Sequence, residues 1–256
     1  MLRDYKLKIL LLFLGCITLS CSDSQNTKFQ KKEFDNKKKV VRKIPQLDDS
    51  NALKELEWYG PENPETIVVI ETKFGNIKIK LFKETSKHRA SFIMLAKRGY
   101  FNDSQFYRVV KNFVAQGGDS DDPAFRKKKR AIGKYHIPNE IDPRRFYHKR
   151  GALSAARSYK NNPKRESTPF DFFIIQGREV TEGDMLQSED ENGLKYTDEQ
   201  KNTYRKIGGD PHLDGQHTVF GEVIDGMDVV DKICDQETDK FEWPVDIIPM
   251  KVKVIE

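Results

Sequence analysis

Most of the chain after residue 65 is a succession of short β-type segments bounded by Gly, Pro, Asn or Asp. In the first two, within "TIVVIETKFGNIKIKLF", a turn containing Gly75 precedes Ile77, Ile79 and Leu81, which alternate with polar residues as in a half-buried strand. The later segments are "QFYRVV", "FVAQGG", "GALSAA", "FDFFIIQG", "HTVFGEVI" and "DIIPMKVKVIE". Many short strands with little helix predict a mainly β protein with a closed or sandwiched antiparallel sheet.

Two helices are expected between these strands. The first lies in "TSKHRASFIMLAKRGYF", with Ser86 at the N-cap position and Gly99 as a stop signal. The second, "GMDVVDKIC", places apolar side chains on one face: Met227, Val230, Ile233 and Cys234. Two polar stretches, about 119–148 and 178–209, fit no strand, and we expect them to be inserted loops with a helix around 197–207.

The N-terminus has the pattern of an export signal. Basic residues precede "ILLLFLGCITLSCSDSQN", whose apolar part is shorter than the ~20 residues of a membrane-spanning helix. The change from "ITLSC" to "SDSQN" resembles a bacterial lipoprotein signal, which implies removal of residues 1–20, lipidation of Cys21 and a location on the bacterial cell envelope; Cys16 is the alternative. With Cys21 lipidated, Cys234 is the remaining thiol, so no intramolecular disulfide is expected.

Residues 21–64 are rich in lysine and poor in apolar clusters, so we expect a tether there, with a short helix in "NALKELEWYG" and the folded domain over 65–256. The formal net charge is +5, and "RKKKR" at 126–130 adds a basic run within the domain. Binding of these lysines and arginines to anionic envelope polymers or to nucleic acid is one interpretation. Solvated basic segments are more common, so we expect no nucleic-acid partner.

Several chemistries are excluded by the motifs. No Gly-rich nucleotide fingerprint opens a helix, and Ser154 in "GALSAAR" is not part of a nucleophile elbow. The histidines show no metal spacing beyond the weak pair His212 and His217, so we expect neither a metal nor a cofactor. Arg108 stands out within "FYRVVKNFVAQGGD". Strand alternation puts it on the face of Phe106 and Val110, where a buried cation needs partners; the alternative is an outward-facing residue at the rim.

The stretch "FYRVVKNFVAQGGD" closely resembles the cyclophilin signature. Later segments, "RGALSAAR", "FDFFIIQG" and "PHLDGQHTVFGEVIDGMDVVDKI", are similar to cyclophilin segments in the same order. The resemblance covers roughly Thr66 to Glu256. It implies a closed eight-stranded antiparallel barrel with two capping helices, carrying the two polar insertions, and peptidyl-prolyl cis-trans isomerase activity.

The resemblance also implies the site. Arg108 would donate to the proline nitrogen of a half-rotated X-Pro bond, whose rotation barrier is about 20 kcal/mol. The implied proline slot is lined by Phe113, Val114, Phe173 and Leu213, with His217 at its wall and His212 beside it. Gln116 would orient Arg108 or the substrate backbone. Ala156 would contact the residue before proline.

The sequence departs from the family pattern at several positions. Tyr107 stands where many members have histidine, and Val114 where many have methionine. Asp171 replaces a frequent glutamine and could pair with Arg108 or face away; His212 replaces an aromatic residue, which predicts weak cyclosporin binding. The leading hypothesis is a monomeric isomerase whose partners are proline-containing exported polypeptides and, through the lipid anchor, a membrane. The alternative is a catalytically weak peptide-binding chaperone of the same fold.

Overall fold

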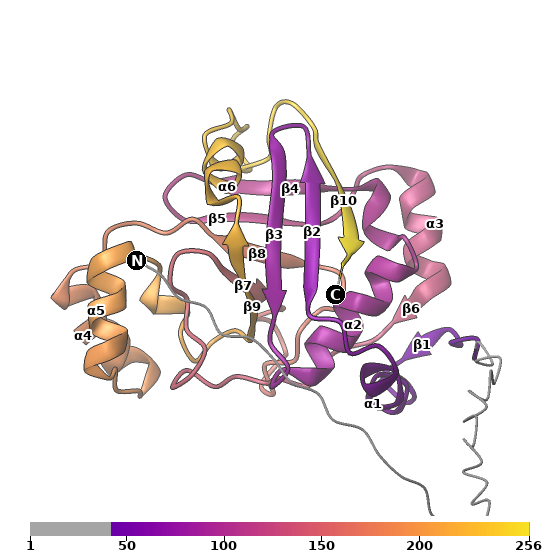
Figure 1. Ribbon diagram of the computed structural model, residues 1–256, viewed down its shortest axis with the longest axis horizontal. Coiled ribbons are helices and arrows are strands. Elements are labelled where there is room, and N and C mark those ends of the chain that lie inside the picture. The colour runs from indigo at the N-terminus through magenta and orange to yellow at the C-terminus, as the bar shows by residue number, and fades with distance from the viewer. Residues whose placement is uncertain (1–41, 256) are drawn as a thin grey trace, which may run out of the picture. The chain divides into compact units, whose positions relative to one another are not determined.

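The computed structural model describes residues 42–255. The predicted signal at 1–20, Cys21 and the tether up to residue 41 lie outside the described residues. Eight strands close into one barrel in the order β10-β2-β3-β9-β7-β8-β5-β4, and every neighbouring pair is antiparallel. The expected eight-stranded antiparallel barrel is therefore confirmed (Figure 1). The strands are β2 Ile67–Thr72, β3 Gly75–Leu81, β4 Ser104–Val110, β5 Val114–Asp119, β7 Ala152–Ala155, β8 Phe172–Ile175, β9 Val219–Asp225 and β10 Ile248–Val254.

The two expected helices are α2 Ser86–Lys97 and α6 Met227–Cys234. Both contribute to the main core: Phe92 of α2 packs its ring against Phe172 and Phe220 of the barrel, and Val230 of α6 is fully buried. Ile77, Ile79 and Leu81 of β3 are buried as their alternation predicts. Local periodicity thus placed these strand residues and the two helices correctly, whereas the closed barrel was implied by the family resemblance.

Residues 43–64 correct the predicted domain boundary. The compact unit begins at Lys43 rather than at residue 65. It opens with β1 Leu47–Asp48, which pairs in parallel with β6 Gly133–Lys134, and continues with α1 Ala52–Glu62. The guanidinium of Arg89 in α2 donates to the carbonyl oxygens of Gly60 (3.1 Å), Asn63 (2.8 Å) and Glu65 (3.1 Å). The few apolar positions that pack against α2 were not recognised from the sequence, because residues 21–64 as a whole are rich in lysine.

The two insertions are helical rather than plain loops. The first contains α3 Pro123–Ile132, whose N-cap Asp122 accepts from the amide of Ala124 at 2.7 Å. The second contains α4 Glu182–Asn192 and the expected helix, α5 Asp198–Ile207. Both start with a capping box, at Thr181 and Thr197, so short local motifs fix where they begin. In Figure 1, α4 and α5 lie on one side of the barrel and α2 and α3 on the other.

Candidate active site

Arg108 reaches the outside of the barrel through a β-bulge. The register of β4 against β5 shifts between Phe106, which pairs with Gly117, and Arg108, which pairs with Gln116. Phe106 is 1% exposed in the core, whereas the side chain of Arg108 is 35% exposed. The extra residue of a bulge resets the alternation, so the prediction that Arg108 shares a face with Phe106 was wrong.

Beside Arg108 lies a pocket of about 140 Å³. Its lining includes all but one of the predicted site residues: Arg108, Phe113, Val114, Gln116, Ala156, Phe173, Leu213 and His217, together with Arg157 and Tyr159. Val114, Phe173 and Leu213 belong to a small apolar cluster with Phe113 and Ala156 at its edge. The fold therefore brings residues from β4, β5, β8 and the segments after β7 and before β9 around one hollow, whose lining is partly apolar and partly polar.

His212 lies at the border of this pocket rather than in its lining. Its ring centroid is 5.7 Å from that of Phe113, and its Nδ1 is paired with the carboxylate of Asp210. The hydrogen bond to Asp210 raises the pKa of His212 above its ordinary value. The edge of the site at His212 is consequently more polar than it would be with an aromatic hydrocarbon side chain at this position.

His217 is a neutral wall of the pocket. One ring nitrogen, Nδ1, lies 3.0 Å from the carbonyl oxygen of Ala155 and must donate to it, so Nε2 accepts from the Tyr159 hydroxyl at 2.7 Å. Burial lowers the pKa of His217 to about 3. The ring is edge-on to Phe173, with centroids 5.2 Å apart. Near pH 7 this imidazole carries no charge, and both of its nitrogens are occupied by hydrogen bonds within the protein.

Arg157 and Tyr159 were missed by the sequence analysis. The Arg157 guanidinium lies 4.2 Å from the centroid of the Tyr159 ring, and its Nε donates to the carbonyl of Gln216 at 2.7 Å. Tyr159 is 67% exposed. Both residues follow β7 in a loop, where neither strand alternation nor helical spacing gives a signal.

A chain of hydrogen bonds runs from Gln116 away from Arg108. The Gln116 amide donates to the Tyr107 hydroxyl at 2.6 Å, and that hydroxyl donates to Asp171 at 3.2 Å. Thr168 also donates to Asp171, at 3.1 Å. Burial raises the pKa of the Asp171 carboxyl. Gln116 therefore donates to Tyr107 rather than to Arg108, and the Asp171 carboxylate is bonded to Tyr107 and Thr168 rather than to the arginine.

The carboxylate that reaches Arg108 is Glu242, 134 residues along the chain. Its Oε2 accepts from Arg108 Nε at 2.7 Å. The guanidinium carbon also lies 5.7 Å from the centroid of the Phe113 ring. Glu242 lies in the connection that follows α6, and nothing in its local sequence indicated that it would be a partner of Arg108.

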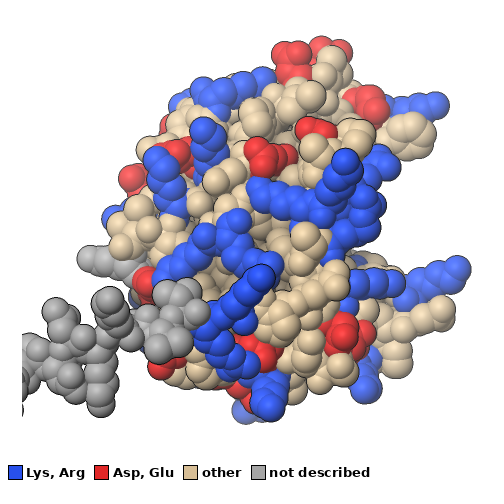
Figure 2. All heavy atoms as spheres, turned by 90° about the vertical axis from the view of Figure 1, so that its right-hand side faces the viewer, with Lys and Arg blue, Asp and Glu red and all other residues tan. Residues whose placement is uncertain are grey.

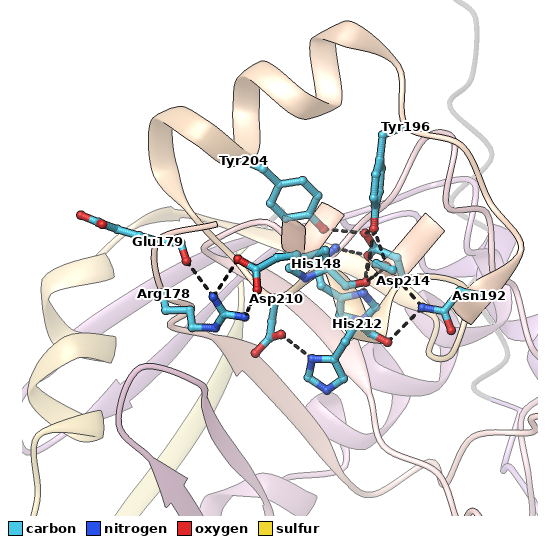
Figure 3. A network of polar contacts seen from close by, with 12 residues as sticks. His148, Arg178, Glu179, Asn192, Tyr196, Tyr204, Asp210, His212 and Asp214 are labelled. Carbon is cyan, nitrogen blue, oxygen red and sulfur yellow. Dashed lines mark hydrogen bonds and ion pairs between the residues drawn. The ribbon is translucent and has the colours of Figure 1, made fainter. Parts of the chain in front are cut away.

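The second insertion supports the segment that carries Leu213 and His217 (Figure 3). Asp214, fully buried, accepts from the Tyr196 and Tyr204 hydroxyls at 2.7 and 2.6 Å. It also accepts from the backbone amide and the ring Nδ1 of His148, at 2.7 and 2.8 Å. The His148 ring stacks on Phe173, with centroids 6.1 Å apart. The inserted helices are thus connected to the wall of the pocket by one buried carboxylate.

A larger hollow of about 640 Å³ lies between β1, the end of α3, β6 and residues 168–171. The face of the molecule where α3 and β6 lie is rich in lysine and arginine (Figure 2). Within the 126–130 run, Lys128 pairs with Asp103 at 2.8 Å and Lys129 with Asp119 at 2.5 Å. Part of the basic run is therefore neutralised within the fold.

Comparison with known proteins identifies the family. Residues 67–254 match the family model described as cyclophilin type peptidyl-prolyl cis-trans isomerase/CLD. The chain belongs to this isomerase family. A putative peptidyl-prolyl cis-trans isomerase of Staphylococcus aureus is 30% identical over 194 residues, covering 75% of this chain and 93% of that protein. Peptidyl-prolyl cis-trans isomerase-like 2 of Rhizopus delemar is 33% identical over 183 residues, which are 71% of this chain but 27% of that protein.

Solved cyclophilin structures agree with the assignment. The crystal structure of a Cryptosporidium parvum cyclophilin-type isomerase has a TM-score of 0.54 and 25% identity, covering 75% of this chain and 98% of that one. The same isomerase in the presence of the dipeptide Ala-Pro gives a TM-score of 0.52, with 74% of this cyclophilin covered and 99% of that chain. Between residues 42 and 255, no three His, Cys, Asp or Glu side chains are grouped to hold a metal, and no helix has the length and apolarity to cross a membrane.

Proposed function

We propose that this cyclophilin acts on X-Pro bonds of exported polypeptides while they fold, from a lipid anchor at Cys21 on the bacterial cell envelope. The N-terminal basic residues, the short apolar stretch and the cysteine followed by "SDSQN" support the location. Proline isomerisation takes tens of seconds to minutes without a catalyst, which makes it a slow step for an exported chain. Proline-containing segments are thus the proposed clients.

The observation that carries the proposed chemistry is a guanidinium beside a pocket that is lined in part by the apolar side chains of Phe113, Phe173 and Leu213. In this proposal the proline ring enters the pocket formed by Phe113, Phe173 and Leu213, and an Nη group of Arg108 faces the prolyl nitrogen. As the peptide bond rotates, that nitrogen loses its conjugation with the carbonyl group and becomes a better hydrogen-bond acceptor. A fixed donor then stabilises the twisted state more than either planar state, which lowers the barrier.

Arg108 suits this role because its guanidinium stays protonated at every physiological pH. Each ~1.4 kcal/mol by which it favours the twisted state gives a tenfold rate gain. Its exposed fraction of 35% means that water screens part of the charge until a peptide covers the pocket. Neutral His217 adds no charge at the wall, so the positive charge of the pocket comes from Arg108 and Arg157.

A proline-isomerisation assay on residues 43–256 tests the proposal. Arg108→Ala should reduce kcat/KM at least tenfold while a proline peptide still binds. The kcat/KM of Arg108→Lys should lie between those of Arg108→Ala and the unmutated chain, because lysine keeps the charge but lacks the planar guanidinium. Peptide binding without rate enhancement by the unmutated chain would favour the chaperone alternative. Full activity of Arg108→Ala would contradict the proposed mechanism.

The proposed anchor is tested in the full chain. Bacterial cells grown with a labelled fatty acid should incorporate the label into this protein and place it in the membrane fraction. Cys21→Ser should abolish both, whereas Cys16→Ser should have no effect if Cys21 is the lipidated residue. Labelling that survives Cys21→Ser would contradict the assignment.

A further inference from the structure

Glu242 occupies an unusual backbone conformation beside Arg108. Its φ of 65° lies in the left-handed region, which residues with a side chain seldom adopt because of steric strain. Its neighbours hold it there: the Glu242 amide donates to the Asp239 carbonyl at 3.0 Å, and the Glu242 carbonyl accepts from Val109 of β4 at 2.9 Å. These two hydrogen bonds fix the backbone of Glu242 beside the bulge, from where its carboxylate reaches Arg108.

The turn that carries Glu242 is built around Asp239. Its carboxylate accepts from the amides of Phe241 at 2.8 Å and Trp243 at 3.0 Å, and its amide donates to the Trp243 carbonyl at 2.8 Å. The Trp243 ring packs against Tyr107, with centroids 5.6 Å apart. The turn is therefore fixed to the same bulge that turns Arg108 outward.

We propose that Glu242 is a positioning residue for Arg108. Its carboxylate accepts from Nε, and the face of Phe113 lies beside the guanidinium, so rotation about the last bonds of the arginine side chain is restricted. The Nε edge is then occupied, and the two Nη groups remain to address the substrate. This inference rests on the proposed role of Arg108.

The opposite effect, competition of the carboxylate with substrate, is disfavoured by the geometry. The recorded contact is through Nε alone and not a bidentate pair across both Nη groups. The two side chains are 35% and 44% exposed, so solvent screens the neutralising effect of Glu242 on the arginine's charge. We therefore expect that Glu242 helps catalysis by restricting the motion of the Arg108 guanidinium more than it hinders catalysis by reducing the arginine's positive field.

The test measures kcat and KM separately for Glu242 variants. Partly exposed ion pairs contribute about 0.2–1 kcal/mol, so Glu242→Ala should lower kcat by a factor of about 1.4 to 5 with little change in KM. Glu242→Gln keeps an acceptor for Nε and should restore at least half of the lost kcat. Asp235→Ala is the control because it removes the carboxylate of another surface ion pair, with Lys111 at 2.8 Å, which is more exposed than the pair of Glu242; it should leave both constants unchanged.

A double-mutant cycle separates positioning from a structural effect. In the Arg108→Ala background, Glu242→Ala should have no further effect on kcat, because there is no guanidinium left to orient. An equal loss in both backgrounds, or a higher kcat for Glu242→Ala alone, would overturn the inference. Failure of the proposed function would look different: Arg108→Ala itself would then keep full activity, which would overturn both proposals.

Discussion

Replacing Asp214 by alanine tests whether the second insertion stabilises the wall of the pocket. The carboxylate accepts from the Tyr196 and Tyr204 hydroxyls and from two nitrogens of His148, and it is fully buried. The Tyr196 hydroxyl keeps alternative partners, Ser188 at 2.9 Å and the Pro211 carbonyl at 3.2 Å. The Tyr204 hydroxyl keeps a hydrogen-bond neighbour in Tyr196, so the change leaves the two nitrogens of His148 as buried donors with no acceptor.

Each buried donor left unsatisfied costs about 1–3 kcal/mol, and relaxation of the site recovers part of that. We expect Asp214→Ala to lower the free energy of unfolding by about 3–5 kcal/mol, a large part of the ~5–15 kcal/mol of a typical domain. Because Leu213 precedes Asp214 and lines the pocket, KM for a proline peptide should rise in the fraction that stays folded.

Urea unfolding of residues 43–256, followed by tryptophan fluorescence, measures this cost. Tyr204→Phe is the matched milder change, because it removes one donor together with one hydrogen bond and should cost about 1 kcal/mol. A loss below 1 kcal/mol for Asp214→Ala, with an unchanged denaturant slope, would refute the view that this carboxylate connects the inserted helices to the site.

Three further predictions follow from burial and from the shape of the site. The pKa of His217 is about 3 in the fold against 6.5 in the unfolded chain, so below pH 6.5 the unfolded state binds the extra proton and stability falls by up to about 1.4 kcal/mol per pH unit. Urea unfolding measured at several pH values between 7 and 4.5 gives the unfolding free energy as a function of pH. This free energy should depend less on pH for His217→Gln than for the unmutated chain, and an equal pH dependence would refute the prediction. A chain shortened to 65–256 should lose several kcal/mol of unfolding free energy relative to 43–256, because Leu47 and Leu56 are buried and Arg89 would lose the carbonyls of Gly60 and Asn63; equal urea midpoints would contradict it. Cyclosporin should inhibit weakly, because polar His212 stands at the pocket border, and nanomolar inhibition in the rate assay would disprove that.

Much of the site could be predicted because the family signature fixes which residues surround the slot. Val114, Phe173 and Leu213 are apolar residues whose identity is visible in the sequence, and they do line one pocket. The partners of the polar residues could not be predicted in the same way. Gln116 was expected to orient Arg108 or the substrate backbone, yet its amide donates to Tyr107. An amide has several acceptors within reach, and which one it meets depends on the packed surroundings.

The sequence by itself determined the strand segments and the two core helices, because alternation, helical spacing and turn residues act over a few neighbouring positions. Closure of eight strands into one barrel was implied by the resemblance to the cyclophilin family and not by these local patterns. The tertiary structure alone decided that a bulge turns Arg108 outward, that Glu242 pairs with it from 134 residues away, and that residues 43–64 fold onto α2. Those outcomes depend on contacts between distant segments. These contacts stabilise the protein only after the barrel has closed and water has been excluded from the side chains and backbone groups that make them.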